Sequence, residues 1–263
     1  MDPSYRVGDD VTVLASHLTV PGVGALAVNS FVLHAQEPVL VDTGMAVDGD
    51  AFLDALRDVI DPSEIRWVWL THDDTDHSGN LPAVLDAAPR AQLVTHAFSA
   101  LRMAAHWPVP LDRVYAIAPG DTLDVGDRGL RASRPPTYDN PMSTALFDEH
   151  TRTYFSVDAF GALLPGVEQS LDDVDDAVLV DGMTLWTKFD SPWSHLSDRL
   201  LFDSNLQEVR ALEPGCVLSS HLPPAFGRLD QLLDVVADVP DADPFVPPGA
   251  ADFREIVAAL AAG

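Results

Sequence analysis

The chain has 263 residues, of which 47% are hydrophobic, enough for a sizeable core in one large or two small domains. Its formal net charge is −26, from 41 acidic and 15 basic residues, so its surface repels phosphate backbones and anionic lipid; we expect no nucleic-acid partner and no membrane partner. Cys216 is the only cysteine, which excludes an internal disulfide and any multi-cysteine zinc or iron–sulfur site.

The start of the chain and its hydropathy predict a cytoplasmic protein. Residues 1–6 lack the basic and apolar regions of a signal peptide, and the sequence has no apolar run long enough for a membrane-spanning helix. A single α/β domain over residues 1–263 is the economical prediction, with a C-terminal helix at 249–263 as an appendage.

The N-terminal part predicts short strands and then a helix. The strand-like runs are separated by turn residues, as is typical of antiparallel neighbours, and lie at residues 11–15, 25–33 and 38–41. The third run ends in Asp42-Thr43-Gly44, where Asp42 is either a turn-former or a residue that supports a neighbouring site. Residues 51–60 carry apolar side chains at helical spacing, and Asp61-Pro62 ends this helix.

The most informative stretch follows a buried strand predicted at residues 65–71. This strand is rich in β-branched and aromatic residues and stops at a polar loop, after which Ser78 and Asn80 can cap a helix at 81–88. A loop held between rigid elements can preorganise metal ligands, because alternate side chains converge. The alternative is an acidic helix N-terminus, which needs no histidine. The loop gathers two imidazoles and three carboxylates: His72, Asp73, Asp74, Asp76 and His77.

Alternating strands and helices continue beyond this loop. We expect a strand at 92–95, a helix at 97–105 and further strands within 113–133. His96 and His106 flank that helix, and we expect both to be surface or packing histidines.

The C-terminal half holds three further candidate stretches. A hairpin at 151–161 ends in Asp158 before small residues and glycine, which places a carboxylate at the sheet rim; the alternative is a simple turn aspartate. Residues 185–194 contain Trp186, Phe189 and Trp193, which either wall an apolar pocket or pack a helix. The remaining predicted elements are a helix at 196–212, a strand at 216–221 that ends at His221, and helices at 229–239 and 253–260.

These motifs resemble the metallo-β-lactamase superfamily, and within it the flavodiiron and related oxygen-binding di-iron proteins. The pattern His-x-Asp-x-Asp-His at residues 72–77 resembles the superfamily's first metal motif, with Asp74 at a position where most of its hydrolases carry histidine. Residues 154–161 resemble the flavodiiron Leu-Phe-Ser-x-Asp-Ala-Phe-Gly, and residues 219–223 resemble Ser-Ser-His-Gly-Pro. Residues 185–194 are similar to the family's Tyr-Tyr-Ala-Asn-Ile-Leu-x-Pro-Phe-Ser, a stretch that borders the active site.

The resemblance implies a fold and a metal centre. The fold is a metallo-β-lactamase-like αββα sandwich of two mixed β-sheets flanked by helices. Asp42 resembles a residue that supports the metal ligands, and Asp139 stands at the offset of a further family histidine, where it either ligates through oxygen or marks a weakened first site. Assigned by family position, one metal takes His72, Asp74 and Asp139, the other takes Asp76, His77 and His221, and Asp158 bridges both.

The chemistry of this ligand set favours iron, with manganese or zinc as alternatives, because carboxylates in place of imidazoles make the site harder. The favoured function is a non-haem di-iron centre that binds or reduces dioxygen or nitric oxide with an external electron donor. We expect no flavodoxin domain and no FMN in this chain, because the sequence lacks a phosphate-cradling loop. A homodimer is compatible with the resemblance.

Two other functions stay open at this point. The same ions would generate a bridging hydroxide that attacks an ester, thioester or phosphodiester, which is the chemistry of a metal-dependent hydrolase. A dioxygen sensor without turnover is the third possibility.

Overall fold

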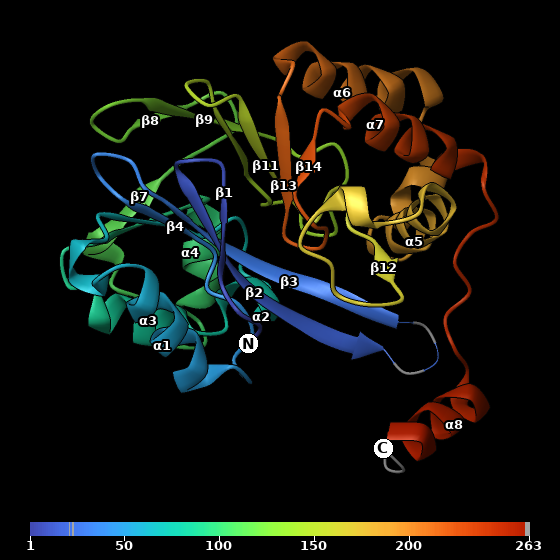
Figure 1. Ribbon diagram of the computed structural model, residues 1–263, viewed down its shortest axis with the longest axis horizontal. Helices are drawn as coiled ribbons and strands as arrows, with labels where there is room; N and C mark the ends of the chain where they lie inside the picture. Colours follow the sequence, from blue (N-terminus) through green and yellow to red (C-terminus); the bar gives the residue numbers. More distant parts are fainter. Residues whose placement is uncertain (21, 23, 261–263) are drawn as a thin grey trace.

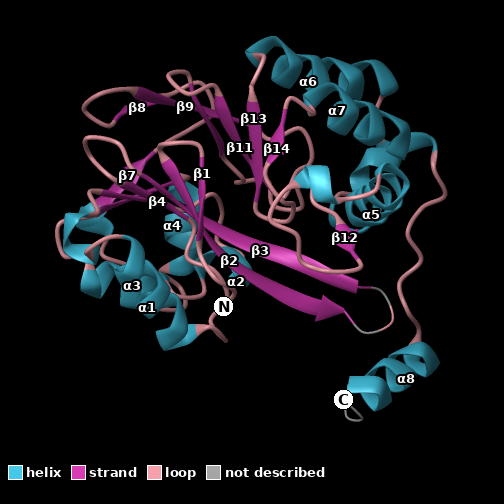
Figure 2. Ribbon diagram, in the orientation of Figure 1, coloured by secondary structure: helices cyan, strands magenta, loops and turns pink. Residues whose placement is uncertain are grey.

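The computed structural model of the protein describes residues 1–20, 22 and 24–260. Within these residues two β-sheets pack face to face, and helices cover both outer faces (Figures 1 and 2). This arrangement confirms the predicted αββα sandwich of two mixed sheets. No helix among the described residues combines the length and the hydropathy needed to cross a membrane.

The first sheet joins an antiparallel N-terminal half to a parallel half. In order across the sheet, its strands are β1 (Tyr5–Val7), β2 (Val11–Val20), β3 (Gly24–Leu33), β4 (Val39–Val41), β5 (Trp67–Trp69), β6 (Gln92–Thr95) and β7 (Val114–Ala116), with β12 (Leu163–Leu164) paired to β3. The pairs from β1 to β4 are antiparallel, as predicted for β2 to β4, and those from β4 to β7 are parallel. Because β4 and β5 run in parallel, Asp42 lies beside the loop that follows β5.

The second sheet is antiparallel except for one pair. In order across the sheet, its strands are β14 (Ala225–Phe226), β13 (Cys216–Ser219), β11 (Thr153–Val157), β10 (Ala145–Asp148), β9 (Gly129–Ser133) and β8 (Thr122–Asp124). The pair β11–β13 is parallel, so the loops that follow these two strands meet at one edge of the sheet. This pairing brings Asp158 next to His221.

Helices cover both sheets. Those on the first sheet are α1 (Gly49–Val59), α2 (Thr75–Ser78), α3 (Leu81–Ala87) and α4 (Ala97–Met103). Those on the second sheet are α5 (Asp176–Asp190), α6 (Arg199–Leu212) and α7 (Leu229–Asp238). Short 3₁₀ turns occupy Pro62–Glu64, Leu111–Arg113, Leu171–Asp173, Pro192–Leu196 and Val239–Asp241.

Apolar side chains from both sheets fill the space between them. Phe31 of β3 and Phe155 of β11 meet edge to face, with ring centroids 5.4 Å apart. Trp69 of β5 is fully buried in the same cluster, so the end of β5 is fixed by packing where the polar loop begins.

The predicted C-terminal appendage corresponds to α8 (Ala250–Leu260). Figure 1 shows this helix apart from the body of the molecule, after an extended segment that follows α7. Residues 261–263 of the predicted appendage lie outside the described residues.

Several predicted boundaries differ from the structure for local reasons. Of the strand predicted at residues 65–71, only β5 (Trp67–Trp69) forms. The helix expected from residue 196 begins at Arg199, because the Asp198 carboxylate accepts hydrogen bonds from the first turn of α6. Asn80 precedes α3 but does not cap it; its side-chain amide donates to the carbonyl oxygens of Thr43 and Met45.

Candidate metal centre

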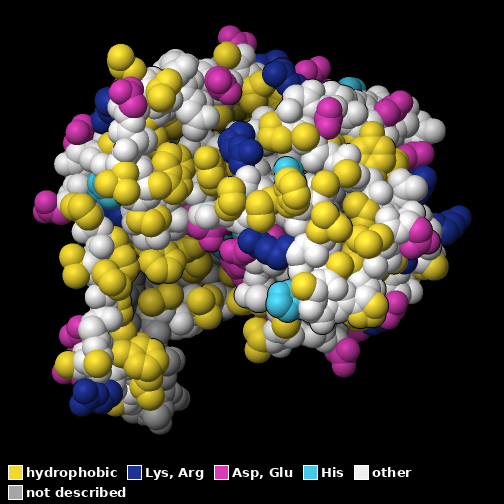
Figure 3. Space-filling model, turned by 180° about the vertical axis from the view of Figure 1, so that it is seen from behind, with side chains coloured by type: hydrophobic (Ala, Val, Ile, Leu, Met, Phe, Trp, Pro, Cys, Tyr) yellow, Lys and Arg dark blue, Asp and Glu magenta, His cyan; other side chains and the backbone are white. Residues whose placement is uncertain are grey.

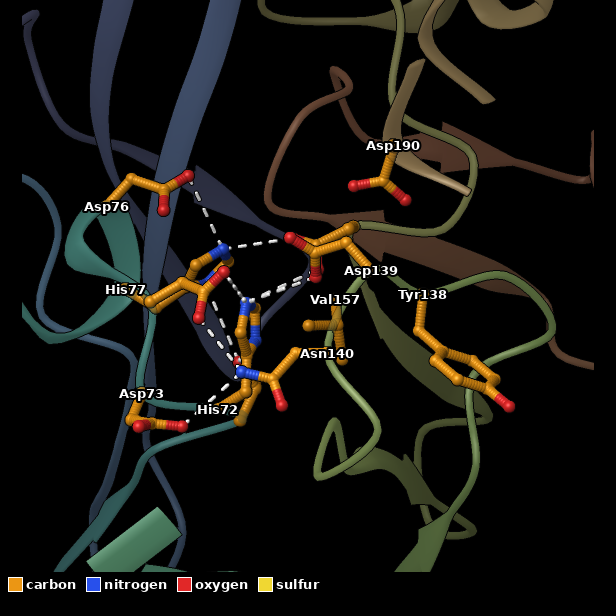
Figure 4. A network of polar contacts seen from close by, with 12 residues as sticks. His72, Asp73, Asp76, His77, Tyr138, Asp139, Asn140, Val157 and Asp190 are labelled. Carbon is orange, nitrogen blue, oxygen red and sulfur yellow. Dashed lines mark hydrogen bonds and ion pairs between the residues drawn. The ribbon is translucent and has the colours of Figure 1, made fainter. Parts of the chain in front are cut away.

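The loops that follow β4, β5, β11 and β13 meet at one edge of the sandwich. The residues predicted as metal ligands all border a cavity of ≈ 300 Å³ there: His72, Asp74, Asp76, His77, Asp139, Asp158 and His221. Figure 4 shows side chains of this cluster pointing toward one another from different elements. On the face drawn in Figure 3, acidic side chains gather in a hollow near the middle of the molecule.

Each histidine of the cluster is oriented through its Nδ1 atom. Nδ1 of His77 donates to Oδ2 of Asp42 over 2.8 Å, and Nδ1 of His221 donates to the carbonyl oxygen of Ala27 over 2.7 Å. Nδ1 of His72 lies 3.2 Å from the Thr71 hydroxyl. A proton on Nδ1 leaves the lone pair on Nε2, which is the atom that faces the carboxylates. The three imidazoles therefore present their metal-binding Nε2 atoms to the cavity.

The first group of ligand atoms surrounds Nε2 of His72. This atom lies 3.8 Å from Oδ2 of Asp74, 3.9 Å from Oδ1 of Asp139 and 3.5 Å from Oδ2 of Asp158. Such separations are long for hydrogen bonds, but ligand atoms held about 2.1 Å from a common ion lie about 3 to 4 Å from one another. The side chains of Asp74 and Asp139 are 37% and 39% exposed, so this group borders solvent.

The second group surrounds Oδ2 of Asp76. This oxygen lies 3.5 Å from Nε2 of His77 and 3.5 Å from Nε2 of His221. Oδ1 of Asp158 completes the group, at 2.9 Å from Nε2 of His77 and 3.1 Å from Nε2 of His221. This set of nitrogen and oxygen atoms suits a second divalent ion.

Asp158 connects the two groups through its two oxygens. Oδ1 faces His77 and His221, whereas Oδ2 faces His72. The residue is 3% exposed, and within the described residues Oδ2 has no hydrogen-bond partner. A buried carboxylate oxygen is costly to leave unpartnered, and a metal ion in the first group would satisfy it. The donor atoms therefore fit a pair of ions bridged by this carboxylate.

The backbone around Asp158 is strained in a way that positions its side chain. Val157 adopts a φ of 61° and Phe160 a φ of 67°, a region that β-branched and aromatic residues rarely occupy. The strain is held by packing, because both side chains are buried in the cluster that covers the second sheet. Backbone strain of this kind concentrates at functional sites.

Protons compensate the clustered carboxylates in this arrangement. Burial alone would lower the pKa of His77, but the negative charges of Asp158 and Asp76 outweigh it and raise that pKa well above the ordinary value. Burial opposes ionisation of Asp158, yet His72 and His77 hold its pKa well below the ordinary range. Burial, together with the charges of Asp158 and Asp74, raises the pKa of Asp139 to about 7. The cluster is thus short of positive charge, which is what metal ions supply.

Sequence reasoning missed three polar contributors to this site. The side-chain amide of Asn140 donates to Oδ1 of Asp74 over 2.9 Å and thereby orients that carboxylate. Arg102 of α4 forms an ion pair with Asp73 and lies 3.5 Å from Asp74. Asp190, the last residue of α5, lines the cavity itself. The sequence held one signal for Asp190: the family stretch that residues 185–194 resemble has leucine at this position, where this chain has aspartate.

Of the three aromatic side chains predicted either to wall a pocket or to pack a helix, Trp186 and Phe189 border the cavity. The Trp186 ring centroid lies 4.7 Å from that of His221, and its indole N–H donates to the carbonyl oxygen of Asp158 over 3.0 Å. The same prediction was wrong for Trp193, whose indole donates to the carbonyl oxygen of Tyr138. Trp193 lies on the 3₁₀ turn after α5 and packs against the apolar cluster of the second sheet.

Gly161 allows these groups to approach closely. A Cβ atom at this position would lie 2.5 Å from Nε1 of Trp186 and 2.8 Å from Cβ of His221. Both separations are shorter than van der Waals contact, so only glycine fits between the indole and the imidazole.

Known proteins share sequence with this chain. Residues 26–221 match the family described as "ODP family beta lactamase". A protein of Thermosynechococcus vestitus named as a putative diflavin flavoprotein is 34% identical over 137 residues, which are 51% of this chain and 24% of that protein. The rubredoxin-oxygen oxidoreductase of Megalodesulfovibrio gigas is 25% identical over 151 residues, which are 56% of this chain and 36% of the relative.

The solved structures show the same fold. A mutant form of the flavo di-iron protein from Thermotoga maritima superimposes with a TM-score of 0.78 at 18% identity, over 92% of this chain and 62% of that one. This chain therefore spans a fraction of the length of its curated relatives, and the matched part is their metallo-β-lactamase-like region. Since the family match covers most of the sequence, the chain belongs to the ODP family of β-lactamase-fold proteins.

Proposed function

We propose that the cluster holds two metal ions, with iron favoured, and that this non-haem di-iron centre binds or reduces dioxygen or nitric oxide. The observation that carries the proposal is the position of Asp158, whose two buried oxygens face two separate groups of ligand atoms. A carboxylate in this position is suited to bridging a pair of ions.

Each ion would have its own ligands on this chain. His72, Asp74 and Asp139 would hold the first ion, and Asp76, His77 and His221 would hold the second. Four carboxylates and three imidazoles, counting Asp158, form a hard donor set that suits iron or manganese better than zinc. When bound in the ferrous state, such a pair supplies a binding position for a diatomic molecule and electrons for its reduction.

The surrounding residues restrict what reaches the ligand atoms. Leu26, Trp186 and Phe189 form the apolar part of a cavity of ≈ 300 Å³, which has room for a diatomic gas or another small molecule. Trp186 also fixes the backbone of Asp158 through its indole hydrogen bond. These side chains keep bulk water from the buried histidines, whereas Asp74 and Asp139 leave one side of the site open.

The relatives support a redox function. One of them is named for rubredoxin and oxygen, and another is named a flavo-diiron protein. By analogy, we propose that this centre receives its electrons from an external donor. We also propose that residues 1–263 act as one metallo-β-lactamase-like domain with α8 appended.

Metal analysis of anaerobically purified protein, with optical spectra before and after exposure to dioxygen or nitric oxide, tests the proposal. We expect two iron ions per chain and a visible band that changes with either gas. Zinc content with turnover of an ester or phosphodiester would overturn the redox function in favour of hydrolysis. A reversible adduct without turnover would identify a sensor.

A variant pair makes this experiment specific. Asp158→Ala should lose iron from both groups, because each group loses an oxygen ligand. Asp181→Asn, at an exposed position of α5, should retain wild-type iron content and an unchanged spectrum.

A further inference from the structure

Asp190 is a buried acid in the cavity that the proposed ligand set does not use. It is the last residue of α5 and is 7% exposed. One carboxylate oxygen from each of Asp139, Asp158 and Asp190 can be chosen so that all three lie within 4.8 Å of one another. Figure 4 shows Asp190 near Asp139, on the side of the cluster away from Asp76.

The contacts of Asp190 leave its negative charge uncompensated. The hydroxyl of Ser191 donates to Oδ2 over 2.9 Å, and this is the one hydrogen bond that its side chain makes among residues 1–20, 22 and 24–260. No lysine or arginine in that part of the chain forms an ion pair with it; Arg102, the cation at this site, pairs with Asp73 and Asp74. Asp190 therefore faces other carboxylates, and no basic side chain of the described residues pairs with it directly.

A second observation points to a ligand at the same place. Oδ2 of Asp158 is buried, lacks a hydrogen-bond partner among the described residues and faces the first group of ligand atoms. Oxygen atoms around a single hard cation have separations of about 3 to 4.5 Å. Three ionised carboxylates at such separations repel one another in a poorly hydrated site, and either bound protons or a metal cation relieves that repulsion. The separations of these three carboxylates, all within 4.8 Å, are compatible with ligation of one ion.

We infer that Asp190 is an additional metal ligand, which shares the first ion with Asp139 and Asp158. This inference rests on the proposed binuclear centre and deepens it. The first ion would then have one imidazole, from His72, and carboxylates from Asp74, Asp139, Asp158 and Asp190. Such a set favours manganese or iron and disfavours zinc, which prefers softer and fewer ligands.

The test compares metal binding by Asp190→Leu, Asp190→Asn and Asp181→Asn with that of the wild type. Metal-free full-length proteins are titrated with Mn²⁺, with Zn²⁺ and, anaerobically, with Fe²⁺, and bound metal is counted. We expect two Mn²⁺ ions in the wild type and in Asp181→Asn. In Asp190→Leu one Mn²⁺ should bind at least tenfold more weakly while the other stays within about twofold of wild type, since only the first group changes. Asp190→Asn should be intermediate, and Zn²⁺ should be affected least.

Melting temperatures separate a ligand from a structural residue. If Asp190 is a ligand, the metal-free Asp190→Asn protein should melt at or above the wild-type temperature, because it lacks a carboxyl group that repels its neighbours when ionised. Adding Mn²⁺ should raise its melting temperature by less than it raises that of the wild type. A structural role would lower the melting temperature of the metal-free protein and weaken both ions equally, which would overturn the inference. So would two Mn²⁺ ions in Asp190→Leu with affinities within twofold of wild type. If the wild type itself binds fewer than two ions, the binuclear centre fails and this inference fails with it.

Discussion

The imidazole of His77 donates a hydrogen bond of 2.8 Å to the carboxylate of Asp42, which lies 35 residues earlier in the chain. The same carboxylate accepts hydrogen bonds from the backbone N–H and the hydroxyl of Thr71, so it fixes both the end of the β5 strand and the tautomer of His77. A carboxylate behind a metal-binding imidazole orients the ring and raises its basicity. Asp42 therefore controls the cluster without facing the cavity.

Replacing Asp42 should weaken metal binding without removing a ligand. We expect Asp42→Ala to bind the ion held by Asp76, His77 and His221 about 10- to 100-fold more weakly, because His77 loses its acceptor. Competition with a chromophoric chelator measures this affinity. Asp54→Asn, at an exposed position of α1, is the charge control and should bind normally. Wild-type affinity in Asp42→Ala would show that the hydrogen bond serves only the fold.

Asp139 gives the sharpest test of the ligand assignment. Asp139→Ala should empty the group of His72 and Asp74 while the group of Asp76, His77 and His221 stays occupied. Asp139→His should restore binding and shift it toward zinc, because an imidazole replaces an oxygen ligand. Metal counting on both variants checks this. Retention of both ions with unchanged affinity in Asp139→Ala would make Asp139 a loop residue.

Most of the candidate metal ligands can be predicted from the sequence, because they lie directly after strands that the sequence pattern reveals. The loop at 72–77 follows a buried strand, and Asp158 and His221 follow two strands of the second sheet, so their types and places are predictable. The parallel pairing that brings the last two together links distant segments, and no local pattern reports it.

The residues that sequence reasoning missed act through tertiary contacts. Asp190 faces the cavity because α5, which was not predicted as a helix, packs on the second sheet and ends at the cavity. Asn140 contacts Asp74 from a loop without periodicity, so its role is invisible before folding.

Metal removal should destabilise the fold, and acidification should partly reverse the loss. The pKa of Asp139 is raised from 3.8 to about 7, so its contribution to folding is present below about pH 4 and is lost as the pH rises toward 7. Burial and the charges of Asp158 and Asp139 also raise the pKa of Asp190, which acts in the same direction. The lowered pKa of Asp158 gives stability that is complete above about pH 4, so it does not change in this window.

Calorimetry of metal-free and metal-loaded protein between about pH 5 and pH 7 measures this effect. We expect the melting temperature of the metal-free wild type to fall more with rising pH than that of Asp139→Asn, which lacks this carboxyl group. The lowered pKa of His72 acts in the opposite direction, equally in both proteins. The loaded protein should melt at a higher temperature throughout. An identical melting curve before and after complete demetallation would contradict the cluster's role.

Metal uptake near neutral pH should release protons. The pKa values of His77 and His221 are raised by Asp158 and Asp76 against the effect of burial, and both Nε2 atoms must lose their protons to bind an ion. We expect about two protons per chain from these imidazoles at pH 7, and a further contribution from the carboxyl groups of Asp139 and Asp190, whose pKa values are also raised. Calorimetric titration with Mn²⁺ in two buffers of different ionisation enthalpy counts them. A binding heat independent of the buffer would mean that these imidazoles are already neutral.

X-ray absorption at the iron edge of anaerobically loaded protein tests whether Asp158 bridges two ions. Two ions sharing the carboxylate of Asp158 should give an iron–iron scattering distance of roughly 3.5 Å, as in other binuclear sites. That signal should disappear in Asp158→Ala. A wild-type spectrum with a single iron environment and no iron neighbour within about 4 Å would show that Asp158 does not bridge two ions.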